Sequence, residues 1–381
     1  MSSDSTYDAI VIGIGGMGSA ATYHLAKRGL DVLGLEQFNI PHNRGSSHGD
    51  TRIIRLAYHE HPFYVPLLFR AYELWEELQD AYGQQLLYKT GSIAAGPAEG
   101  DRVDNVIESC ERHGVEYELM SSAAVNETYP GYQLPEDYEA VYQPDGGFVT
   151  PEQCIAAHVE RAHAHGAEIH GREKVLDWRP TSGGGVKVRT NKDRYEAEKL
   201  VVTAGAWASK LLPALEAHTN VERRVMAWLQ PERPAQFTPE QFPVFTLQTR
   251  GSSYYGFPVF GVPGFKFGRS PEIAETVDPD AFQSEEPTPQ DEELLRGFAE
   301  EFFPAGAGPT LSLETCMLTM SPDDHFIVDR HTEYPQVTVG AGFSGHGFKL
   351  ASVVGELLAQ LTTGDDIDFD IETLSMDRLD S

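Results

Sequence analysis

The chain has 381 residues, 40% of them hydrophobic, and a formal net charge of −29 from 58 acidic and 29 basic residues. This length suits two domains or one interleaved pair, and so acidic a surface excludes nucleic acid as a partner, because phosphate binding needs positive charge. No stretch approaches the roughly 18 consecutive apolar residues of a membrane span, and no basic segment followed by an apolar one opens the chain. We therefore expect a cytoplasmic protein without a membrane partner.

The acidic residues are dispersed along the chain, and lysine is scarce, with nine lysines against twenty arginines. This balance is typical of a protein from a high-salt cytoplasm, where screening over a few ångström removes the self-repulsion of the surface. An ordinary acidic bacterial enzyme is the alternative. The three cysteines, Cys110, Cys154 and Cys316, are too scattered for a disulfide scaffold or a zinc site. The histidines show no ligand spacing either, so we expect no metal.

The N-terminal segment carries the pattern of a dinucleotide-binding unit. A strand, a glycine turn, a helix and a second strand are expected in that order, over residues 7–12, 13–18, 19–28 and 31–35. The turn reads GxGxxG on Gly13, Gly15 and Gly18, which permit the turn, the approach of a pyrophosphate and close helix–strand packing. The helix N-terminus stabilises phosphate, and Glu36 suits a ribose without a 2′-phosphate. This unit predicts a dinucleotide and leaves NAD and FAD open.

Helix signals continue through the first half of the chain. After an arginine-rich loop over 43–55, helices are expected over about 62–82, 101–113 and 151–165. Gly114 ends the second of these. Thr150 is the expected N-cap of the third, with Pro151 at its first position and Gln153 closing a capping box.

The second half of the chain is richer in strands. Strands joined by a polar turn are expected between residues 167 and 203, before a small-residue turn at 204–207 that opens another helix. The remaining expected elements are a β-rich segment over about 221–268, an acidic linker over 283–290, strands near 311–318, 326–329 and 336–341, and a helix over about 347–361.

This order of elements predicts an α/β fold, in which a Rossmann-like FAD-binding domain is interleaved with a β-rich, α+β substrate domain. We expect the first domain to comprise 1–85, 150–220 and 320–381, and the second 86–149 and 221–319. Interleaving favours FAD over NAD, because the Rossmann domain of an NAD dehydrogenase is usually contiguous.

The glycine-rich segment before the last helix is a second candidate cofactor contact. Gly342, Gly345 and Gly347 allow the backbone to lie flat against a planar ligand. The helix that they open would stabilise negative charge on a reduced flavin. Lys349 lies in the first turn of that helix, where a cation is unfavourable unless it meets an anion such as a substrate carboxylate. A solvated surface lysine is the alternative.

Arg52 and Arg55 form a candidate anion-binding pair. On a helical turn, residues three apart share one side, and two converging guanidinium groups suit a carboxylate. A structural ion pair is the alternative. Cys316, on an apolar strand, has the pattern of an ordinary core cysteine.

Four longer motifs resemble those of one flavoprotein family. They are SSHGDTRIIR, VVTAGAW, CMLTMSPDDHFIVDRH and AGFSGHGFKLASVVGELLAQL, which begin at residues 46, 201, 316 and 341. Together with the N-terminal turn they resemble the monomeric sarcosine oxidase and N-methyltryptophan oxidase family, within the D-amino-acid-oxidase-like group. The resemblance covers essentially the whole chain and implies FAD as the cofactor.

The resemblance also implies roles for single residues. Cys316 matches the cysteine that binds the flavin 8-methyl carbon through a thioether, so FAD would be held covalently. Arg55 and Lys349 match the pair that holds the substrate carboxylate. Lys266 matches the lysine near flavin N5 that activates oxygen.

Further positions follow from the same resemblance. It places His48, Thr51 and Arg52 along the flavin and Tyr255 in the substrate pocket. It implies a monomer that oxidises an N-methyl amino acid with O2 and releases an aldehyde, the demethylated amino acid and hydrogen peroxide.

Two positions depart from the family pattern. Ser270 stands where family members often carry a histidine, and Leu318 where they often carry a tyrosine. Both changes count against sarcosine itself as the substrate, and Leu318, with the aromatic stretch over 254–257, suits a larger or more apolar amine.

Two rival functions stay open from the sequence. A non-covalent FAD amino-acid oxidase or dehydrogenase, acting at Cα of a glycine- or proline-like substrate, would release its flavin on denaturation. A flavin-binding assembly or regulatory protein without turnover would have no use for Arg55, Lys266 and Lys349.

Overall fold

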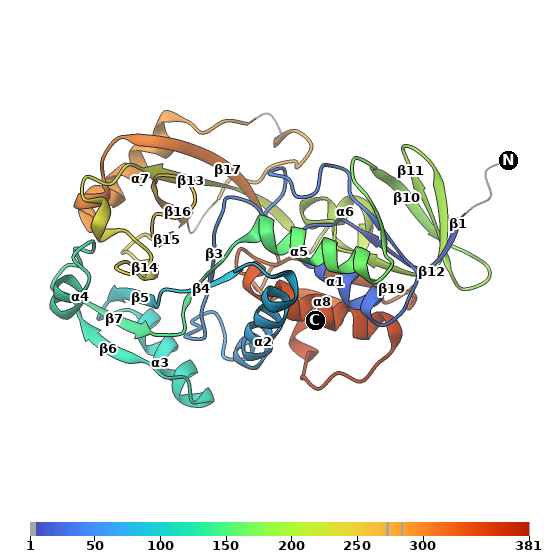
Figure 1. Ribbon diagram of the computed structural model, residues 1–381, viewed down its shortest axis with the longest axis horizontal. Coiled ribbons are helices and arrows are strands. Elements are labelled where there is room, and N and C mark those ends of the chain that lie inside the picture. The colour runs from blue at the N-terminus through green and yellow to red at the C-terminus, as the bar shows by residue number, and fades with distance from the viewer. Residues whose placement is uncertain (1–4, 272–273, 283–284, 381) are drawn as a thin grey trace.

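The computed structural model describes residues 5–271, 274–282 and 285–380, and it has the α/β architecture expected from the sequence. Two lobes lie side by side in Figure 1. One contains the N-terminal strand β1 (Ser5–Ile12), and the other contains the antiparallel strands around β14 (Val244–Gln248) and β15 (Ser252–Phe257).

The first sheet is built around parallel strands. Its order is β10 (Val175–Pro180), β11 (Val186–Thr190), β12 (Arg194–Val202), β1, β2 (Val32–Leu35) and β9 (Glu168–His170), with β19 (Val337–Ala341) beside β12 and β18 (Ile327–Arg330) beside β19. Strand β1 is buried on both faces, because Ala9 and Val11 face one core cluster while Ile10 and Ile12 face another. The carboxyl ends of β1, β2, β12 and β19 meet at one edge, where ligands of open α/β sheets bind.

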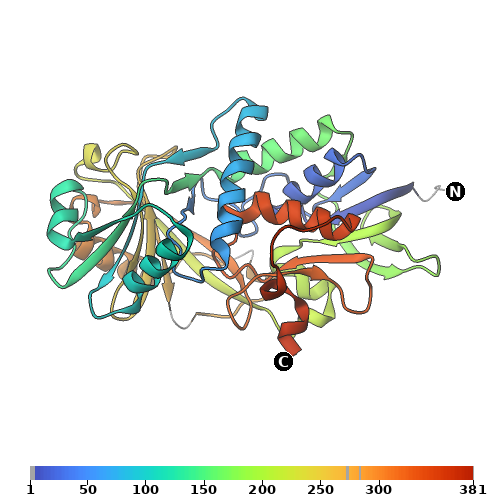
Figure 2. The same cartoon turned by 90° about the horizontal axis from the view of Figure 1, so that it is seen from below.

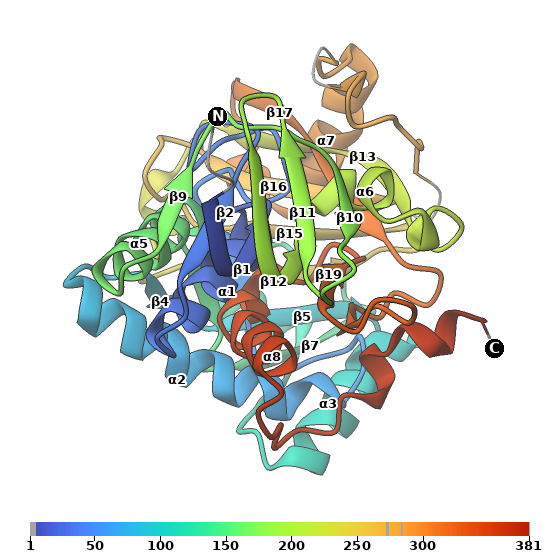
Figure 3. The same cartoon turned by 90° about the vertical axis from the view of Figure 1, so that its right-hand side faces the viewer.

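Helices α1 (Gly16–Lys27), α5 (Pro151–Ala164) and α8 (Ala351–Thr363) gather on one face of this sheet (Figure 3). Helices α1 and α8 approach closely, because a Cβ on Gly355 would lie only 2.3 Å from that of Ala20. This contact brings the start of α8 beside the glycine turn that precedes α1.

The second sheet is antiparallel except between β14 and β5. Its order is β17 (Thr310–Met320), β13 (Asn220–Leu229), β16 (Phe265–Pro271), β15, β14, β5 (Ser92–Pro97), β7 (Tyr138–Gln143) and β6 (Glu118–Ser121). Phenylalanines such as Phe242 and Phe265 fill its core. Helix α7 (Pro289–Phe302) adds Phe298, whose ring stacks on Tyr254 at a centroid distance of 3.7 Å.

A small third sheet and one long helix join the lobes. The sheet contains β3 (Arg52–Ile54), β8 (Gly147–Val149) and β4 (Leu87–Lys89). Helix α2 (Tyr64–Tyr82) stands between the lobes in Figure 2. Its Trp75 donates a hydrogen bond to the backbone oxygen of Lys349 at 2.9 Å, so α2 fixes the segment that carries this lysine.

Several predicted helices are confirmed. Helix α2 matches the periodicity over 62–82, and α3 (Asp101–His113) ends at Gly114 with φ of +65°. Helix α6 (Ala208–Leu211) follows the predicted turn at 204–207, as expected. The short helix α4 (Ser122–Thr128) was not predicted.

Two predictions about helix starts need correction. Thr150 and Pro151 stand at the predicted N-cap and first position of α5, but the Thr150 side chain makes no capping hydrogen bond and there is no capping box with Gln153; its hydroxyl donates to the Leu86 oxygen at 3.4 Å. The expected linker over 283–290 overlaps α7, a helix that the sequence analysis did not predict; positions 283 and 284 lie outside the described residues. Thr288 and Asp291 form the capping box that begins α7.

The predicted backbone around two site residues also needs correction. The last helix begins at Ala351 rather than 347, so Lys349 lies in a 3-10 turn, Phe348–Leu350, that precedes α8. Arg52 and Arg55 do not share a helical turn, because Arg52 begins strand β3 and Arg55 follows its end.

Within the described ranges, none of the helices is both long and apolar enough to cross a lipid bilayer. The same residues contain no group of three or more His, Cys, Asp and Glu side chains placed to hold a metal ion.

Candidate active site

The presence of glycine at each of the three positions of the N-terminal turn has a different structural reason. Gly13 has φ of +89°, and a Cβ there would lie 2.6 Å from the Thr203 oxygen. A Cβ on Gly18 would lie 1.8 Å from the Gly13 oxygen, so both positions need glycine for packing. A Cβ on Gly15 would meet only the Ser47 hydroxyl oxygen, at 4.0 Å, which leaves the backbone there open to a ligand.

Glu36 supports this turn from the end of β2. Its two carboxylate oxygens accept from the backbone N–H groups of Ile14 and Phe38, each at 2.9 Å. A carboxylate oxygen has more than one acceptor position, so Glu36 can still accept a hydrogen bond from a ribose hydroxyl. The carboxylate is buried and lines the cavity above the turn.

The first cavity has a volume of about 380 Å³ and lies over the carboxyl edge of the first sheet. The glycine turn, Glu36, Trp207 and the C-terminal glycine loop line it. In that loop Gly345 has φ of +78°, and a Cβ on Gly347 would lie 2.6 Å from the Phe343 Cβ. The loop therefore requires glycine at both positions and presents its backbone to the cavity.

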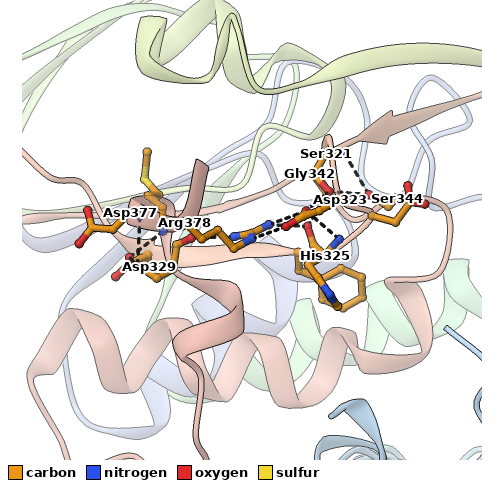
Figure 4. A network of polar contacts seen from close by, with 12 residues as sticks. Ser321, Asp323, His325, Asp329, Gly342, Ser344, Asp377 and Arg378 are labelled. Atoms are coloured by element: carbon orange, nitrogen blue, oxygen red, sulfur yellow. Dashed lines mark hydrogen bonds and ion pairs between the residues drawn. The ribbon is translucent and has the colours of Figure 1, made fainter. Parts of the chain in front are cut away.

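A polar network behind the C-terminal glycine loop holds it in place (Figure 4). The Ser344 hydroxyl accepts from the backbone N–H of Ser321 at 3.1 Å and donates to the Gly342 oxygen at 3.2 Å. Arg378, near the end of the chain, pairs with Asp323 at 2.8 Å. The loop is thus fixed from strand β17 and from the C-terminal segment.

The second cavity, of about 790 Å³, adjoins the first, and Arg52, Leu318, Ser344, Gly345 and Phe348 line both. The predicted site residues that line the second cavity are Arg52, Arg55, Tyr255, Cys316, Gly345 and Lys349, with the two departures Ser270 and Leu318. The fold therefore brings these residues, from distant segments, around one space.

Lys266 lies behind the wall of the second cavity and is buried. Its ammonium donates to the backbone oxygens of Gly49 and Thr51, at 2.5 and 2.9 Å, and to the Thr51 hydroxyl at 3.0 Å. It also lies 4.5 Å from the ring centroid of Phe257. Burial, with the nearby Arg52 guanidinium, holds the pKa of Lys266 well below its usual value.

Arg55 is held by an acidic side chain that the sequence analysis did not single out. Its guanidinium donates to both oxygens of Glu60 at 2.7 Å and to the backbone oxygen of Ala57 at 2.6 Å. One terminal nitrogen also lies 3.0 Å from Nδ1 of His59. In the sequence, Glu60 was indicated only by its position five residues after Arg55, between the loop expected over 43–55 and the helix expected from about 62.

Lys349 is buried beside Arg55 on the same cavity wall. Its ammonium donates to the His346 oxygen at 2.8 Å and lies 3.5 Å from the Tyr58 hydroxyl. Burial and the Arg55 charge lower the pKa of Lys349 to about 7, although Glu60 acts in the opposite direction. Lys349 is therefore not a solvated surface lysine.

Cys316 lies on β17, opposite Arg224 of β13, and its side chain is buried beside Met226 and Trp228. Burial raises the pKa of its thiol, while Arg52 and Arg224 oppose that shift. The cysteine lines the second cavity, so its sulfur is not enclosed by the core alone.

His48 and Thr51 line neither cavity. Thr51 accepts from Lys266, as described above, and His48 lies 3.9 Å from the Glu314 carboxylate. Burial lowers the pKa of His48 to about 3, so its ring is neutral.

Comparison with known proteins identifies the family. Residues 8–361 match the family model described as DAO, FAD dependent oxidoreductase. The chain belongs to this family.

Relatives in the DAO family cover almost the whole chain. A monomeric sarcosine oxidase of Bacillus sp. (strain NS-129) is 40% identical over 98% of this chain and 97% of its own. An N-methyl-L-tryptophan oxidase of Yersinia pestis (strain Pestoides F) is 35% identical over 98% and 99%. These relatives confirm the family resemblance seen in the sequence.

Solved structures show the same fold. The open form of NikD, an amino acid oxidase of nikkomycin biosynthesis, has a TM-score of 0.85 at 25% identity and covers 97% of both chains. An L-proline dehydrogenase of P. horikoshii has a TM-score of 0.86 at 22% identity, over 99% of both chains. The protein is therefore an FAD-dependent oxidoreductase of the DAO fold, as expected.

The geometry of the two cavities fits the FAD of this family. The open backbone at Gly15, the N-terminus of α1 and Glu36 suit a pyrophosphate and a ribose. The adjoining second cavity offers Gly345 of the glycine loop and Cys316 to a ring system. Both parts of a flavin dinucleotide thus have matching surfaces in one continuous space.

Proposed function

We propose that the protein is an FAD-dependent oxidase that demethylates an N-methyl amino acid, either sarcosine or a bulkier substrate. One observation carries this proposal: two buried cations, Arg55 and Lys349, line the cavity that adjoins the nucleotide cavity and also contains Cys316. The relatives named sarcosine oxidase and N-methyl-L-tryptophan oxidase support the same reaction class.

When bound, FAD would supply an acceptor for a hydride from the N-methyl carbon of the neutral amine; water would add to the resulting iminium to release formaldehyde and the primary amine, and O2 would take up the electron pair with two protons as hydrogen peroxide. Arg55 and Lys349 would hold the substrate carboxylate and so orient the amine. Tyr255 and Leu318 would enclose the remainder of the substrate and exclude water.

Lys266 would stabilise the negative charge that develops as O2 is reduced. Its ammonium is fixed by three hydrogen bonds and surrounded by aromatic rings, so its charge needs little reorganisation. His48, Thr51 and Arg52 would support this region: Thr51 orients Lys266, and Arg52, which lines both cavities, adds positive charge beside it.

Covalent attachment of FAD through Cys316 is part of the proposal. Cys316 lines the second cavity; burial raises the pKa of its thiol, and the charges of Arg52 and Arg224 oppose that shift and favour a thiolate. Acid precipitation tests the bond: a yellow precipitate is expected from the native chain and a colourless one from Cys316→Ala. Release of the flavin by acid from the native chain would instead favour the non-covalent oxidase or dehydrogenase.

The proposal also includes a division of the chain into two domains. We assign the first sheet and its helices to an FAD-binding domain of 1–85, 150–220 and 320–381, and the second sheet to a substrate domain of 86–149 and 221–319. The pairing of strands from separate segments in each sheet supports this division. We further propose a cytoplasmic monomer adapted to high salt, on the basis of its net charge of −29 and of relatives named monomeric.

Anaerobic mixing with a panel of N-methyl and cyclic amino acids tests the activity. Bleaching of the flavin absorbance by an N-methyl amino acid, reversed on admitting air, is the expected result. Formaldehyde and hydrogen peroxide should form in equal amounts. A flavin that stays oxidised with every member of the panel would overturn the proposed reaction and leave the family and fold unchanged.

A further inference from the structure

We propose that the second cavity selects an N-methyl amino acid with an acidic side chain, and that Arg102 binds the side-chain carboxylate. This inference rests on the proposed function, because Arg55 and Lys349 must take the first carboxylate. It differs from the apolar substrate expected from the sequence. The reason is a part of the cavity wall whose residues belong to none of the sequence motifs described above.

Arg102, in the first turn of α3, lines the second cavity and has only neutral partners. One terminal nitrogen donates to the side-chain oxygen of Gln248 at 2.8 Å and to the Ser253 hydroxyl at 2.9 Å. Its Nε is buried without a hydrogen-bond partner. Across the residues that the structure describes, no carboxylate forms an ion pair with Arg102. The charge of Glu60 acts on this guanidinium only from a distance, without an ion pair.

His59 links Arg102 to the proposed carboxylate clamp. Arg55 approaches its Nδ1 at 3.0 Å, and Arg102 approaches its Nε2 at 2.9 Å. Burial keeps the pKa of His59 well below its usual value, so the ring is neutral and has one N–H and one acceptor nitrogen. With the proton on Nδ1, a Glu60 carboxylate oxygen 3.4 Å away can accept from that N–H, while Nε2 accepts from Arg102. His59 thus connects Arg102 to the Arg55–Glu60 pair without a charge of its own.

The charged side chains that line the second cavity also favour a substrate with two carboxylates. The cationic side chains that line the cavity outnumber the carboxylates by two: they are Arg52, Arg55, Arg102, Arg224 and Lys349, against Glu60, Glu222 and Asp324. A substrate with one carboxylate leaves a net positive charge among these groups, whereas a dicarboxylate balances it. Burial lowers the pKa of Arg102 to about 10; the Glu60 charge opposes this shift and Arg55 adds to it.

The wall around Arg102 is polar rather than apolar. Thr246, Gln248 and Ser253 line the cavity together with Ser270, which pairs with Ser253 across β15 and β16. The Thr246 hydroxyl is buried without a hydrogen-bond partner. Against such a wall a hydrocarbon side chain would remove water from polar groups without giving them new hydrogen bonds, whereas a carboxylate brings acceptors.

The test compares a matched substrate pair in the holoenzyme. N-methylglutamate and N-methylglutamine have nearly the same shape and differ by one negative charge. We expect kcat/KM to be at least about tenfold higher for the acid, since a site built for a charged hydrogen-bond partner rejects its neutral analogue. In Arg102→Gln this ratio should fall toward one, mainly through a higher KM for the acid.

A matched control separates binding from structure. Arg269 is also half-buried and donates to a serine hydroxyl, that of Ser252 at 2.7 Å, but it does not line the second cavity. Arg269→Gln should keep the native ratio. If Arg102 had only a structural role, Arg102→Gln would lower both activities in proportion and leave the ratio unchanged, which would overturn the proposal.

Two further outcomes are decisive. Should Arg102→Gln fail to fold, Arg102→Lys, which keeps the charge without the planar fork, is expected to lower the ratio partially. A native ratio of one or less, with N-methyl amino acids still oxidised, would overturn this inference alone. A flavin that neither member of the pair nor sarcosine reduces would overturn the proposed function and this inference together.

Discussion

Arg55 donates to both carboxylate oxygens of Glu60, each at 2.7 Å, inside the cavity that we propose for the substrate. A substrate carboxylate that binds Arg55 must therefore compete with an internal carboxylate. Burial opposes ionisation of Glu60, but Arg55 keeps its pKa well below the usual value, so the competing charge is present at every working pH.

Glu60→Gln should strengthen carboxylate binding and weaken the fold. The change leaves Arg55 without its counter-charge, so the Kd for acetate, followed by the flavin spectrum, should fall about tenfold. The free energy of unfolding should fall by about 3 kcal/mol, because a buried cation is left unpaired. Glu73→Gln, which removes an exposed partner of Arg70, is the control and should change neither quantity. Weaker acetate binding by Glu60→Gln would contradict the competition.

Binding of a simple carboxylate should weaken as the pH rises through about 7. The pKa of Lys349 is lowered to about 7 by burial, so its ammonium is present below that pH and is lost above it. The pKa of His346 is about 4 and that of Tyr58 is raised well above 10.0, so neither neighbour titrates in this range.

The measurement is the Kd of acetate, which carries no amine of its own to titrate. It should rise about tenfold between pH 6.5 and 8.5, as a shift of about one pKa unit on binding requires. Lys349→Met should bind acetate weakly and without this pH dependence. A native Kd that stays constant over the range would mean that Arg55 alone holds the carboxylate.

Lys266→Met should separate the two halves of the reaction. Anaerobic reduction of the flavin by substrate should survive, because Lys266 does not line the substrate cavity, whereas reoxidation by O2 should slow at least about 100-fold. Stopped-flow absorbance measures both rates. The exposed Lys89→Met should leave both unchanged. If both rates fell equally in Lys266→Met, the proposed role of Lys266 in the reaction with O2 would be wrong.

Stability should rise with salt. The net charge of −29 repels itself at low ionic strength, and the screening length falls from about 10 Å at 0.1 M to about 3 Å at 1 M. We expect Tm to increase by about 10 °C between 0.1 and 2 M KCl, and a sucrose series of equal osmolality to give a smaller increase. A Tm that does not change with KCl would favour an ordinary acidic enzyme.

Local patterns in the sequence predicted the nucleotide-binding half of the site. Gly13 and Gly18 are required by the backbone of a single turn, and Glu36 follows within the same βαβ unit, so short-range spacing contains the information. The same kind of local signal predicted the start of α5 at Thr150 correctly but not its hydrogen bonds, since the Thr150 hydroxyl donates to Leu86, a residue far away in the sequence, and makes no cap.

The sequence by itself determined the family, the cofactor and the residues that match the family motifs. The tertiary structure alone decided what those residues contact. Lys266 and the Gly49 oxygen are 217 positions apart, and Arg102 meets Gln248 across 146 positions. Such contacts depend on sheet pairing between distant strands, which leaves no periodic signal in the chain. For this reason the sequence predicted Arg55 and Lys349 as the carboxylate clamp, and only the fold showed Arg102 on the wall of the same cavity.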